Sequence, residues 1–399
     1  KNASLVYCDN TNLLWCAGEN GIDILDEKNQ FFTTHYFNQK FSEAFQQQFG
    51  EVKVFALRKN KIWAGAWFGN GLYCLNENFE IEKTFVTLPP QNTNKESSQV
   101  NDIFVDSDST LWICTFGGLV HFVPEKNSWK LFSAASKNIP SNRATHFFRD
   151  SKGIYWISFY RSGLYWFDKN TEKFLLAFPQ NPKLHILDIT EDGNKNVWLA
   201  TEDRGLLKFS HPENKFINYP SPKYAPDFTV NGLMFDNKKH LWCSTRKGIS
   251  IIDLKTDSVE FLTSAEGLSS DNVNGTLQDK SGRIWIATSN GLNVYEEGKK
   301  SVRVFYKADG LPADGINAAF TKNNSEKFLL SGTNFITEFL PDSLLKNTFV
   351  PPVRITSAQI FGEKILFSEN GKHEKFLQLN WQHFWLERGR GSLKSCGQH

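Results

Sequence analysis

A short motif recurs along the whole chain and limits what the chain can fold into. Its clearest copy, Ser281 to Leu292, reads Ser-Gly-Arg-Ile-Trp-Ile-Ala-Thr-Ser-Asn-Gly-Leu and predicts a turn, a short strand and a second turn. Seven copies carry a tryptophan, at intervals of 42 to 49 residues: Trp15, Trp63, Trp112, Trp156, Trp198, Trp242 and Trp285. An eighth, degenerate copy lacks the tryptophan and centres on Leu329. Such a period is typical of a β-propeller or a solenoid, in which a repeat buries its apolar face only against its neighbours.

The third copy shows the repeating unit most clearly. Residues 101–106 form a short apolar run that we interpret as the innermost strand, and 106–110 form a polar turn. Residues 111–115 predict the second strand, 118–123 the third and 129–132 the outermost. Four short strands joined by tight turns predict a meander blade, so the fold class is an all-β propeller of four-stranded blades.

Two residue types recur at fixed places in the unit. An aspartate lies six residues before the tryptophan in six copies, whereas the second copy has Leu57 there. We interpret this aspartate as a hairpin-turn residue, because its carboxylate bonds the nearby backbone. The anchor tryptophans are expected to fill the core between blades.

The repeat pattern stops after Phe339. Pro341, Pro351 and Pro352 break strands and mark a boundary, so residues 1–345 are predicted to be the propeller. Residues 353–360 predict a strand that opens a new element, and 381–399 show neither strand period nor helix caps, which predicts a disordered tail.

The copies resemble the two-component-regulator propeller repeat, whose pattern is roughly Asp-x-x-Gly-x-Leu-Trp-Ile-Gly-Thr-x-x-Gly-Leu. The matching residues of the seventh copy are Asp279, Gly282, Ile284, Trp285, Ile286, Thr288, Gly291 and Leu292. In that family the last repeat loses its tryptophan and continues into a Pro-Pro-x-x-Ile-Thr segment. That segment opens a β-sandwich called the YYY domain. The chain is similar to this junction at Phe339, Pro341, Pro351, Pro352, Ile355 and Thr356. The resemblance implies that residues 346–380 begin a truncated YYY-like sandwich.

The number of blades stays open between seven and eight. The first copy can be the last blade of an upstream propeller, with copies two to eight closing a seven-bladed ring, or all eight copies can close together. The 48-residue step after the first copy and the polar run at residues 46–48 favour seven.

The composition excludes several classes of function. A net charge of +2 predicts no nucleic-acid binding, and no apolar run is long enough to span a bilayer. Of the six cysteines, Cys16, Cys114 and Cys243 lie just after an anchor tryptophan, where other copies carry apolar residues, which argues against a disulfide framework or a metal site. No catalytic or cofactor-binding motif is present, so we expect no cofactor, no metal and no enzyme activity. The adjacent acids Glu202 and Asp203 leave a glycosidase as an alternative.

The candidate binding site lies in two sets of loops that share one face of a propeller. These are the turns between the second and third strands and the loops that enter each innermost strand. Some of the turns are aromatic and others are charged. The candidate ligand-binding residues are Trp67, Phe68, Phe116, Arg143, Phe159, Tyr160, Arg161, His185, Arg204, Arg246 and Lys247. Aromatic rings beside basic groups suit an acidic or neutral oligosaccharide. The alternatives are a partner-protein surface and aromatic rings packed under neighbouring loops.

The resemblance implies a function for the whole. Propellers of this family form the periplasmic sensor region of membrane-bound, often hybrid, histidine kinases in gut-type Bacteroidetes, and many respond to carbohydrate breakdown products. It therefore implies a non-enzymatic, ligand-sensing module, dimeric in the full receptor and joined to the membrane by segments outside this chain. A propeller glycosidase or lyase and a protein-interaction scaffold are the alternatives.

Overall fold

The computed structural model describes most of the chain. It describes residues 3–8, 13–18, 21–26, 31–37, 52–67, 71–136, 139–316, 320–323, 325–332, 335–345, 358–360 and 363–365. The chain divides into two compact units, Lys1–Asn347 and Thr348–His399. None of the helices in the described part is long and apolar enough to cross a membrane.

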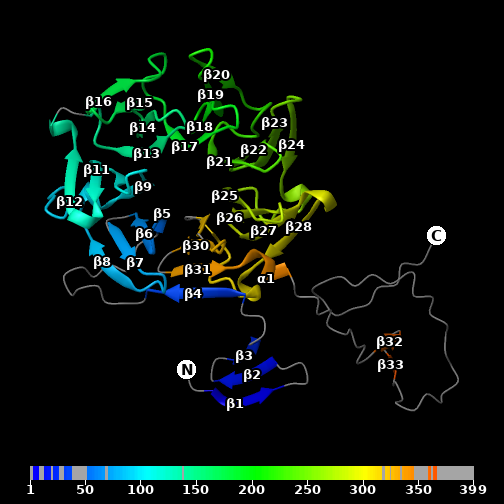
Figure 1. The fold of residues 1–399 in the computed structure, drawn as a ribbon. Coiled ribbons are helices and arrows are strands. Elements are labelled where there is room, and N and C mark those ends of the chain that lie inside the picture. Colours follow the sequence, from blue (N-terminus) through cyan, green and yellow to red (C-terminus); the bar gives the residue numbers. More distant parts are fainter. Residues whose placement is uncertain are drawn as a thin grey trace. The chain divides into compact units, whose positions relative to one another are not determined.

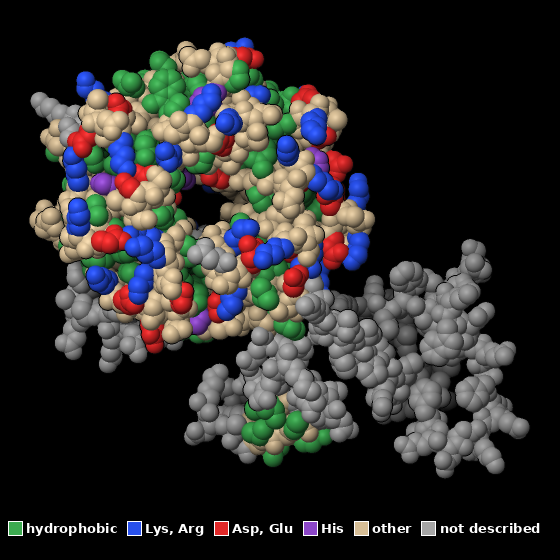
Figure 2. Space-filling model, viewed as in Figure 1, with side chains coloured by type: hydrophobic (Ala, Val, Ile, Leu, Met, Phe, Trp, Pro, Cys, Tyr) green, Lys and Arg blue, Asp and Glu red, His purple; other side chains and the backbone are tan. Residues whose placement is uncertain are grey.

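Seven four-stranded antiparallel sheets form a ring, which confirms a seven-bladed propeller (Figure 1). The first three blades are β5 (Val52–Arg58), β6 (Lys61–Ala66), β7 (Leu72–Leu75) and β8 (Ile81–Phe85); β9 (Val100–Val105), β10 (Leu111–Thr115), β11 (Gly118–Val123) and β12 (Ser128–Phe132); and β13 (Ala144–Arg149), β14 (Tyr155–Phe159), β15 (Gly163–Asp168) and β16 (Lys173–Leu176). The next three are β17 (Ile186–Glu191), β18 (Val197–Thr201), β19 (Leu206–Ser210) and β20 (Lys215–Tyr219); β21 (Val230–Phe235), β22 (His240–Thr245), β23 (Gly248–Asp253) and β24 (Ser258–Leu262); and β25 (Val273–Gln278), β26 (Ile284–Thr288), β27 (Gly291–Glu296) and β28 (Ser301–Phe305). The first strand of each blade is innermost, and these strands surround the opening visible at the centre of the ring in Figure 2.

The seventh blade takes its outermost strand from the beginning of the chain. It consists of β29 (Phe320–Lys322), β30 (Phe328–Gly332), β31 (Phe335–Phe339) and β4 (Phe32–Tyr36), and β4 pairs with β31 from Phe32↔Phe339 to Tyr36↔Phe335. The hydroxyls of Thr34 and Thr337 lie 2.8 Å apart across this ladder. On the other side, the Ser331 hydroxyl donates to the Val52 carbonyl of the first blade at 2.8 Å. Two distant parts of the chain therefore close the ring.

The first repeat is not one of the seven blades. Its strands β1 (Ala3–Cys8), β2 (Leu13–Gly18) and β3 (Gly21–Asp26) form a three-stranded sheet of their own. Copies two to eight supply the ring, as the preferred sequence interpretation predicted. The helices in the described residues of the first unit are short: α1 (Pro341–Leu345) and the 3-10 turns η2 (Lys95–Ser98), η3 (Pro124–Lys126), η4 (Ala134–Ser136), η5 (Ser264–Glu266), η6 (Glu297–Lys299) and η7 (Lys307–Asp309).

The second unit is described only at one antiparallel strand pair, β32 (Ala358–Ile360) and β33 (Glu363–Ile365). The rest of the predicted sandwich start at 346–380 and the predicted tail at 381–399 lie outside the described residues.

The core lies between successive blades. Five anchor tryptophans on the second strands are almost completely buried: Trp112, Trp156, Trp198, Trp242 and Trp285. Trp112 stacks on Phe147 of the next blade, with ring centroids 5.0 Å apart. The large rings thus fill the wedges that open between radially arranged sheets.

The recurrent aspartate has two roles. In the fourth blade, Asp192 Oδ1 accepts the backbone N–H groups of Asn194 and Asn196, at 2.8 and 2.9 Å, which fixes the hairpin turn. Asp192 Oδ2 accepts the indole N–H of Trp198 at 2.9 Å. The same indole–carboxylate bond, between 2.8 and 3.2 Å, recurs in four more blades. The first blade has Leu57 in place of the aspartate, and the buried Trp63 Nε1 there has no hydrogen-bond partner among the described residues.

Replacement of this aspartate should be costly. We expect Asp192→Ala to lower the free energy of unfolding by about 2–3 kcal/mol, because it leaves a buried indole N–H and turn amides without their acceptor. Asp253→Ala is the matched control, since Asp253 accepts Lys255 N and the Thr256 hydroxyl in an exposed turn. Urea unfolding followed by circular dichroism measures both variants. Equal losses in the two would show that the indole bond contributes nothing.

Candidate functional site

The turns between second and third strands are shaped by one recurring hydrogen bond. In the second blade, the Thr115 hydroxyl donates to the Gly118 carbonyl at 2.9 Å and accepts from the Gly117 amide at 3.0 Å. Gly118 has a φ of 137°, and a Cβ there would lie 2.3 Å from the Phe132 carbonyl oxygen. Only glycine fits such a position. The Thr–Gly pair makes the turn tight and presents its middle residues outward.

Each of these turns lies beside the loop that enters its own blade. The Phe116 amide donates to Gln99 at 3.3 Å, the Tyr160 amide to Arg143 at 2.7 Å and the Glu202 amide to His185 at 3.1 Å, in each case to the backbone carbonyl. The two sets of loops predicted from the sequence therefore share one face of the ring, which we call the turn face.

Successive blades bring aromatic and charged side chains together on this face. The rings of Phe116 and Tyr160 lie 5.9 Å apart, and His185 meets Tyr160 edge-on at 4.6 Å. The guanidinium of Arg143 lies 5.4 Å from the Phe116 centroid and 5.9 Å from that of Tyr160. The guanidinium of Arg161 lies 5.3 Å from the Tyr160 centroid. Tyr160 thus has two cations over its ring.

Two glutamates balance these cations. Arg143 Nη2 lies 3.3 Å from Glu96 Oε1, and Arg161 Nη2 lies 3.4 Å from Glu202 Oε2. His185 Nδ1 also bonds Glu202 Oε2, at 2.9 Å. The hydrogen bond with His185 lowers the pKa of Glu202, although partial burial acts in the opposite direction. The turn-face cluster is defined as Glu96, Phe116, Arg143, Tyr160, Arg161, His185 and Glu202.

The structure places the other predicted residues in different surroundings. The indole N–H of Trp67 donates to Asn101 Oδ1 at 3.3 Å, and the Lys53 ammonium lies 5.1 Å from its ring centroid. Phe159 is completely buried and packs edge-on against Tyr165 and Phe174, so its ring belongs to the core rather than to the face. Phe68 lies outside the described residues.

The cationic side chains on the charged turns of the fourth and fifth blades are exposed. Arg204, Arg246 and Lys247 form no side-chain ion pair within the part of the chain that the structure describes. Their turns have the same architecture, since the Thr245 hydroxyl donates to the Gly248 carbonyl at 2.7 Å. The backbone amide of Arg204 donates to the Thr201 hydroxyl at 3.0 Å, and the Arg204 side chain is exposed.

Three successive innermost strands carry a row of ionisable groups that the repeat motif did not predict. Asp102, His146 and Asp188 each lie ten residues before the anchor tryptophan of their blade. Burial raises the pKa of Asp102 to about 7 and that of Asp188 to about 6. It lowers the pKa of His146 to about 4. The fixed distance from the tryptophan was a signal that could have found them.

These aspartates join neighbouring blades. Asp102 Oδ2 accepts the Phe147 amide of the next blade at 2.9 Å. Asp188 Oδ2 likewise accepts the Leu233 amide at 2.8 Å. Their role is structural, and no group of three or more potential ligands among the described residues could hold a metal ion.

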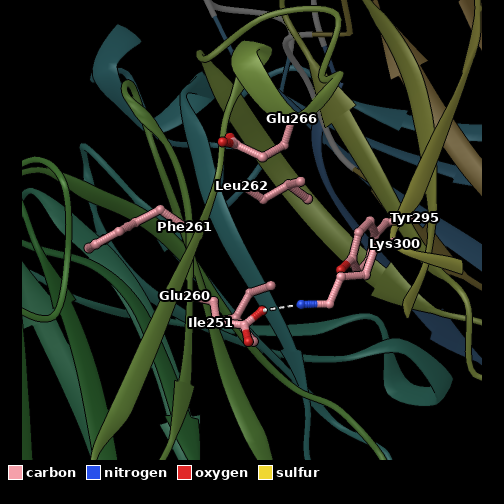
Figure 3. A pocket seen from close by; sticks show the side chains of 7 residues that line it. All are labelled: Ile251, Glu260, Phe261, Leu262, Glu266, Tyr295 and Lys300. Carbon is pink, nitrogen blue, oxygen red and sulfur yellow. Dashed lines mark ion pairs between the residues drawn. The ribbon is translucent and has the colours of Figure 1, made fainter. Parts of the chain in front are cut away.

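A separate hollow of about 320 Å³ lies between the fifth and sixth blades (Figure 3). Ile251, Leu262 and Tyr295 contribute apolar surface, and Glu260 and Lys300 form an ion pair across it at 3.9 Å. Its remaining lining residues are Phe261 and Glu266. None of the candidate residues from the sequence lines it.

Comparison with known proteins supports the repeat assignment. The chain has 20% identity to the extracellular domain described as that of the hybrid two component system BT3049 from B. thetaiotaomicron, with a TM-score of 0.73 over 92% of this chain and 50% of that one. The corresponding domain of BT4673 from the same organism gives 17% identity and a TM-score of 0.64 over 90% and 49%. Virginiamycin B lyase from Staphylococcus aureus gives 11% identity and a TM-score of 0.60 over 77% and 99%.

These likenesses establish the fold. The chain spans about half the length of the two extracellular domains. A sequence search finds no significant match among curated proteins. The family model named "Two component regulator propeller" matches residues 267–290, which contain Trp285 and most of the copy that it anchors. This chain carries the two component regulator propeller repeat, as its sequence predicted.

Proposed function

We propose that this chain is the ligand-sensing propeller of a hybrid two-component histidine kinase, located in the periplasm, and that it responds to an oligosaccharide without converting it. The repeat and the likeness to extracellular domains of such systems support the sensor role. We propose that the full receptor is a dimer with two signalling states. Ligand binding outside the membrane shifts the equilibrium between these states, and the shift is passed through the membrane.

The observation that carries the ligand assignment is the combination of rings and cations on the turn face. Tyr160 and Phe116 supply rings of the kind that packs against a sugar, and the guanidinium groups of Arg143 and Arg161 lie over these rings. Arg204 and Arg246 add exposed guanidinium groups from the next two blades. Guanidinium groups bind carboxylate and sulfate through two parallel hydrogen bonds, so this face suits an acidic oligosaccharide.

The geometry gives little support to a glycosidase. A general acid needs a raised pKa and a proton to donate. Glu202 is already bonded to His185 and Arg161, and its pKa is lowered, so it is charged at neutral pH. Asp203 is exposed on the same turn, so it lacks the burial that would raise the pKa of a general acid.

An incubation with a panel of oligosaccharides tests the proposal. A sensor raises the melting temperature of the propeller and leaves the oligosaccharide intact, because binding stabilises the folded state. Release of shortened or unsaturated products would identify a glycosidase or a lyase instead. No stabilisation by any member of an acidic and neutral panel would favour a protein-interaction scaffold.

The two exposed arginines give a sharper prediction. The double substitution Arg204→Ala with Arg246→Ala should weaken binding of an acidic oligosaccharide more than about tenfold, since each charge-assisted contact contributes roughly 1.5–3 kcal/mol. The loss should be larger at low salt, where charges are screened less. Stability should not change, because both side chains are exposed on turns.

Calorimetric titration with uronate or sulfated oligosaccharides measures the effect. Arg303→Ala is the matched control, because Arg303 is exposed on the outermost strand β28, with its guanidinium 4.8 Å from the Phe305 centroid. Equal affinities for the parent and the double variant would move the binding site away from these two turns.

A further inference from the structure

The two arginines over Tyr160 are held only loosely. Their ion pairs, at 3.3 and 3.4 Å, are longer than a strong charge-assisted bond, and the side chains of Arg143 and Arg161 are 46% and 62% exposed. An exposed ion pair of this kind contributes little to stability. A ligand anion of better geometry can therefore compete with the protein's own carboxylates.

The two ion pairs differ in which partner the glutamate keeps when its arginine moves away. Glu96 has Arg143 as its ion-pair partner on this face, whereas Glu202 bonds both Arg161 and His185. The His185–Glu202 contact, at 2.9 Å, is shorter than the Arg161–Glu202 contact, at 3.4 Å. If Arg161 moves away, Glu202 still has its shorter hydrogen bond. Release of Arg161 thus leaves no unpaired carboxylate.

The position of Arg161 also favours exchange. It lies in the turn between β14 and β15, with a φ of 48°, and its guanidinium remains over the Tyr160 ring at 5.3 Å. The ring contact requires no carboxylate, so the guanidinium can turn its donors toward solvent while it stays on the ring. A carboxylate or sulfate placed beside Tyr160 can then accept two hydrogen bonds from the Arg161 guanidinium, which is already held in position.

We propose that Arg161 is an exchangeable anion clamp, released from Glu202 to bind a carboxylate or sulfate group of the ligand while His185 keeps Glu202 in place. This inference rests on the proposed function, because it specifies which charged group of the oligosaccharide is bound and which residue binds it. Glu202 acts as an internal competitor. A neutral oligosaccharide cannot displace it, so the exchange favours acidic ligands over neutral ones of the same shape.

Inorganic sulfate is a suitable probe, because it tests the clamp without a known oligosaccharide. Sodium sulfate is titrated against sodium chloride at equal ionic strength. The side-chain Nε–Hε signal of Arg161 and the backbone amide signal of Ser162, which is present in every variant, are followed by NMR in uniformly ¹⁵N-labelled protein. The variants are Glu202→Gln, Arg161→Gln and the combination of both. Arg303→Gln is the control for an exposed arginine that lies over an aromatic ring.

We expect a saturable shift of the Arg161 signal with sulfate. Glu202→Gln removes the competing charge and should strengthen sulfate binding roughly two- to fivefold, in line with the weak pairing of exposed ions. Arg161→Gln should abolish the site, and the double variant should show no gain from Glu202→Gln. Arg161→Lys keeps the charge but loses the two parallel donors, so it should bind sulfate more weakly than the parent.

Three results would overturn the clamp: no saturable shift of Arg161, no strengthening in Glu202→Gln, or an equal effect of Arg303→Gln. The outcome is separable from that of the proposed function. If an acidic oligosaccharide stabilises the chain but Arg161 does not respond to sulfate, the sensor function is supported and the Arg161 clamp is contradicted. If sulfate binds at Arg161 but no oligosaccharide of the panel binds, the clamp stands and the oligosaccharide assignment falls.

Discussion

Trp198→Ala should destabilise the propeller by about 3–5 kcal/mol, the usual cost of removing a large buried ring. Trp198 is completely buried, lies 4.7 Å from the Tyr219 ring centroid and packs with Leu206, Val230 and Leu241, so it touches both its own blade and the next. The substitution leaves a cavity between two blades and removes the indole donor of Asp192. Urea unfolding followed by far-ultraviolet circular dichroism gives the change in free energy.

The control for this substitution is Leu175→Ala on the outermost strand β16. Leu175 is 60% exposed, so its truncation should change stability by less than about 0.5 kcal/mol. Near-native stability of Trp198→Ala would mean that the ring is not buried between blades and that the blade register is wrong.

Phe32→Ala should have an effect of similar size, although Phe32 is almost 300 residues from the blade that it completes. Phe32 packs in one core cluster with Phe339, at a ring distance of 5.3 Å, and with Phe305, at 6.1 Å. Its loss should cost about 3–5 kcal/mol and loosen the pairing of β4 with β31. Hydrogen–deuterium exchange should then rise in Phe335–Phe339 while β17–β20 stay protected.

Tyr36→Ala is the matched control on the same strand. Tyr36 is 59% exposed and meets Phe335 only edge-on, so its removal should cost less than about 1 kcal/mol. If Phe32→Ala leaves both stability and exchange at β31 unchanged, β4 does not close the ring.

The repeat pattern was enough to predict the blades, because each tryptophan fills the same kind of space between two neighbouring sheets. The strand predicted around Leu111 to Thr115, the aspartate turn before it and the glycine turn after it all lie where the pattern puts them. The source of the seventh outermost strand was harder to predict. The pattern stops after Phe339, and α1 stands where a fourth strand would begin. Phe32 lies 17 residues after Trp15, the same interval that separates Trp129 from Trp112 in an ordinary outermost strand.

The site was predictable only in outline. Tight Thr–Gly turns fix which residues face outward, so Phe116 and Arg246 could be placed from the sequence. Phe159 could not, because it occupies the buried position at which a threonine ends the second strand in four other blades. The pairing of Arg161 with Glu202 joins residues of different blades, and no local pattern reports such a contact.

We propose that the turn face binds an oligosaccharide that the chain leaves intact. Hydrogen–deuterium exchange with and without the most strongly stabilising oligosaccharide of the panel tests it most directly. We expect protection at residues 115–118, 159–163 and 201–205 and at the loops ending at Arg143 and His185, with the oligosaccharide recovered unchanged. Protection confined to the aspartate turns at the other end of the same strands, such as residues 150–154 and 192–196, or recovery of a cleaved product, would contradict it.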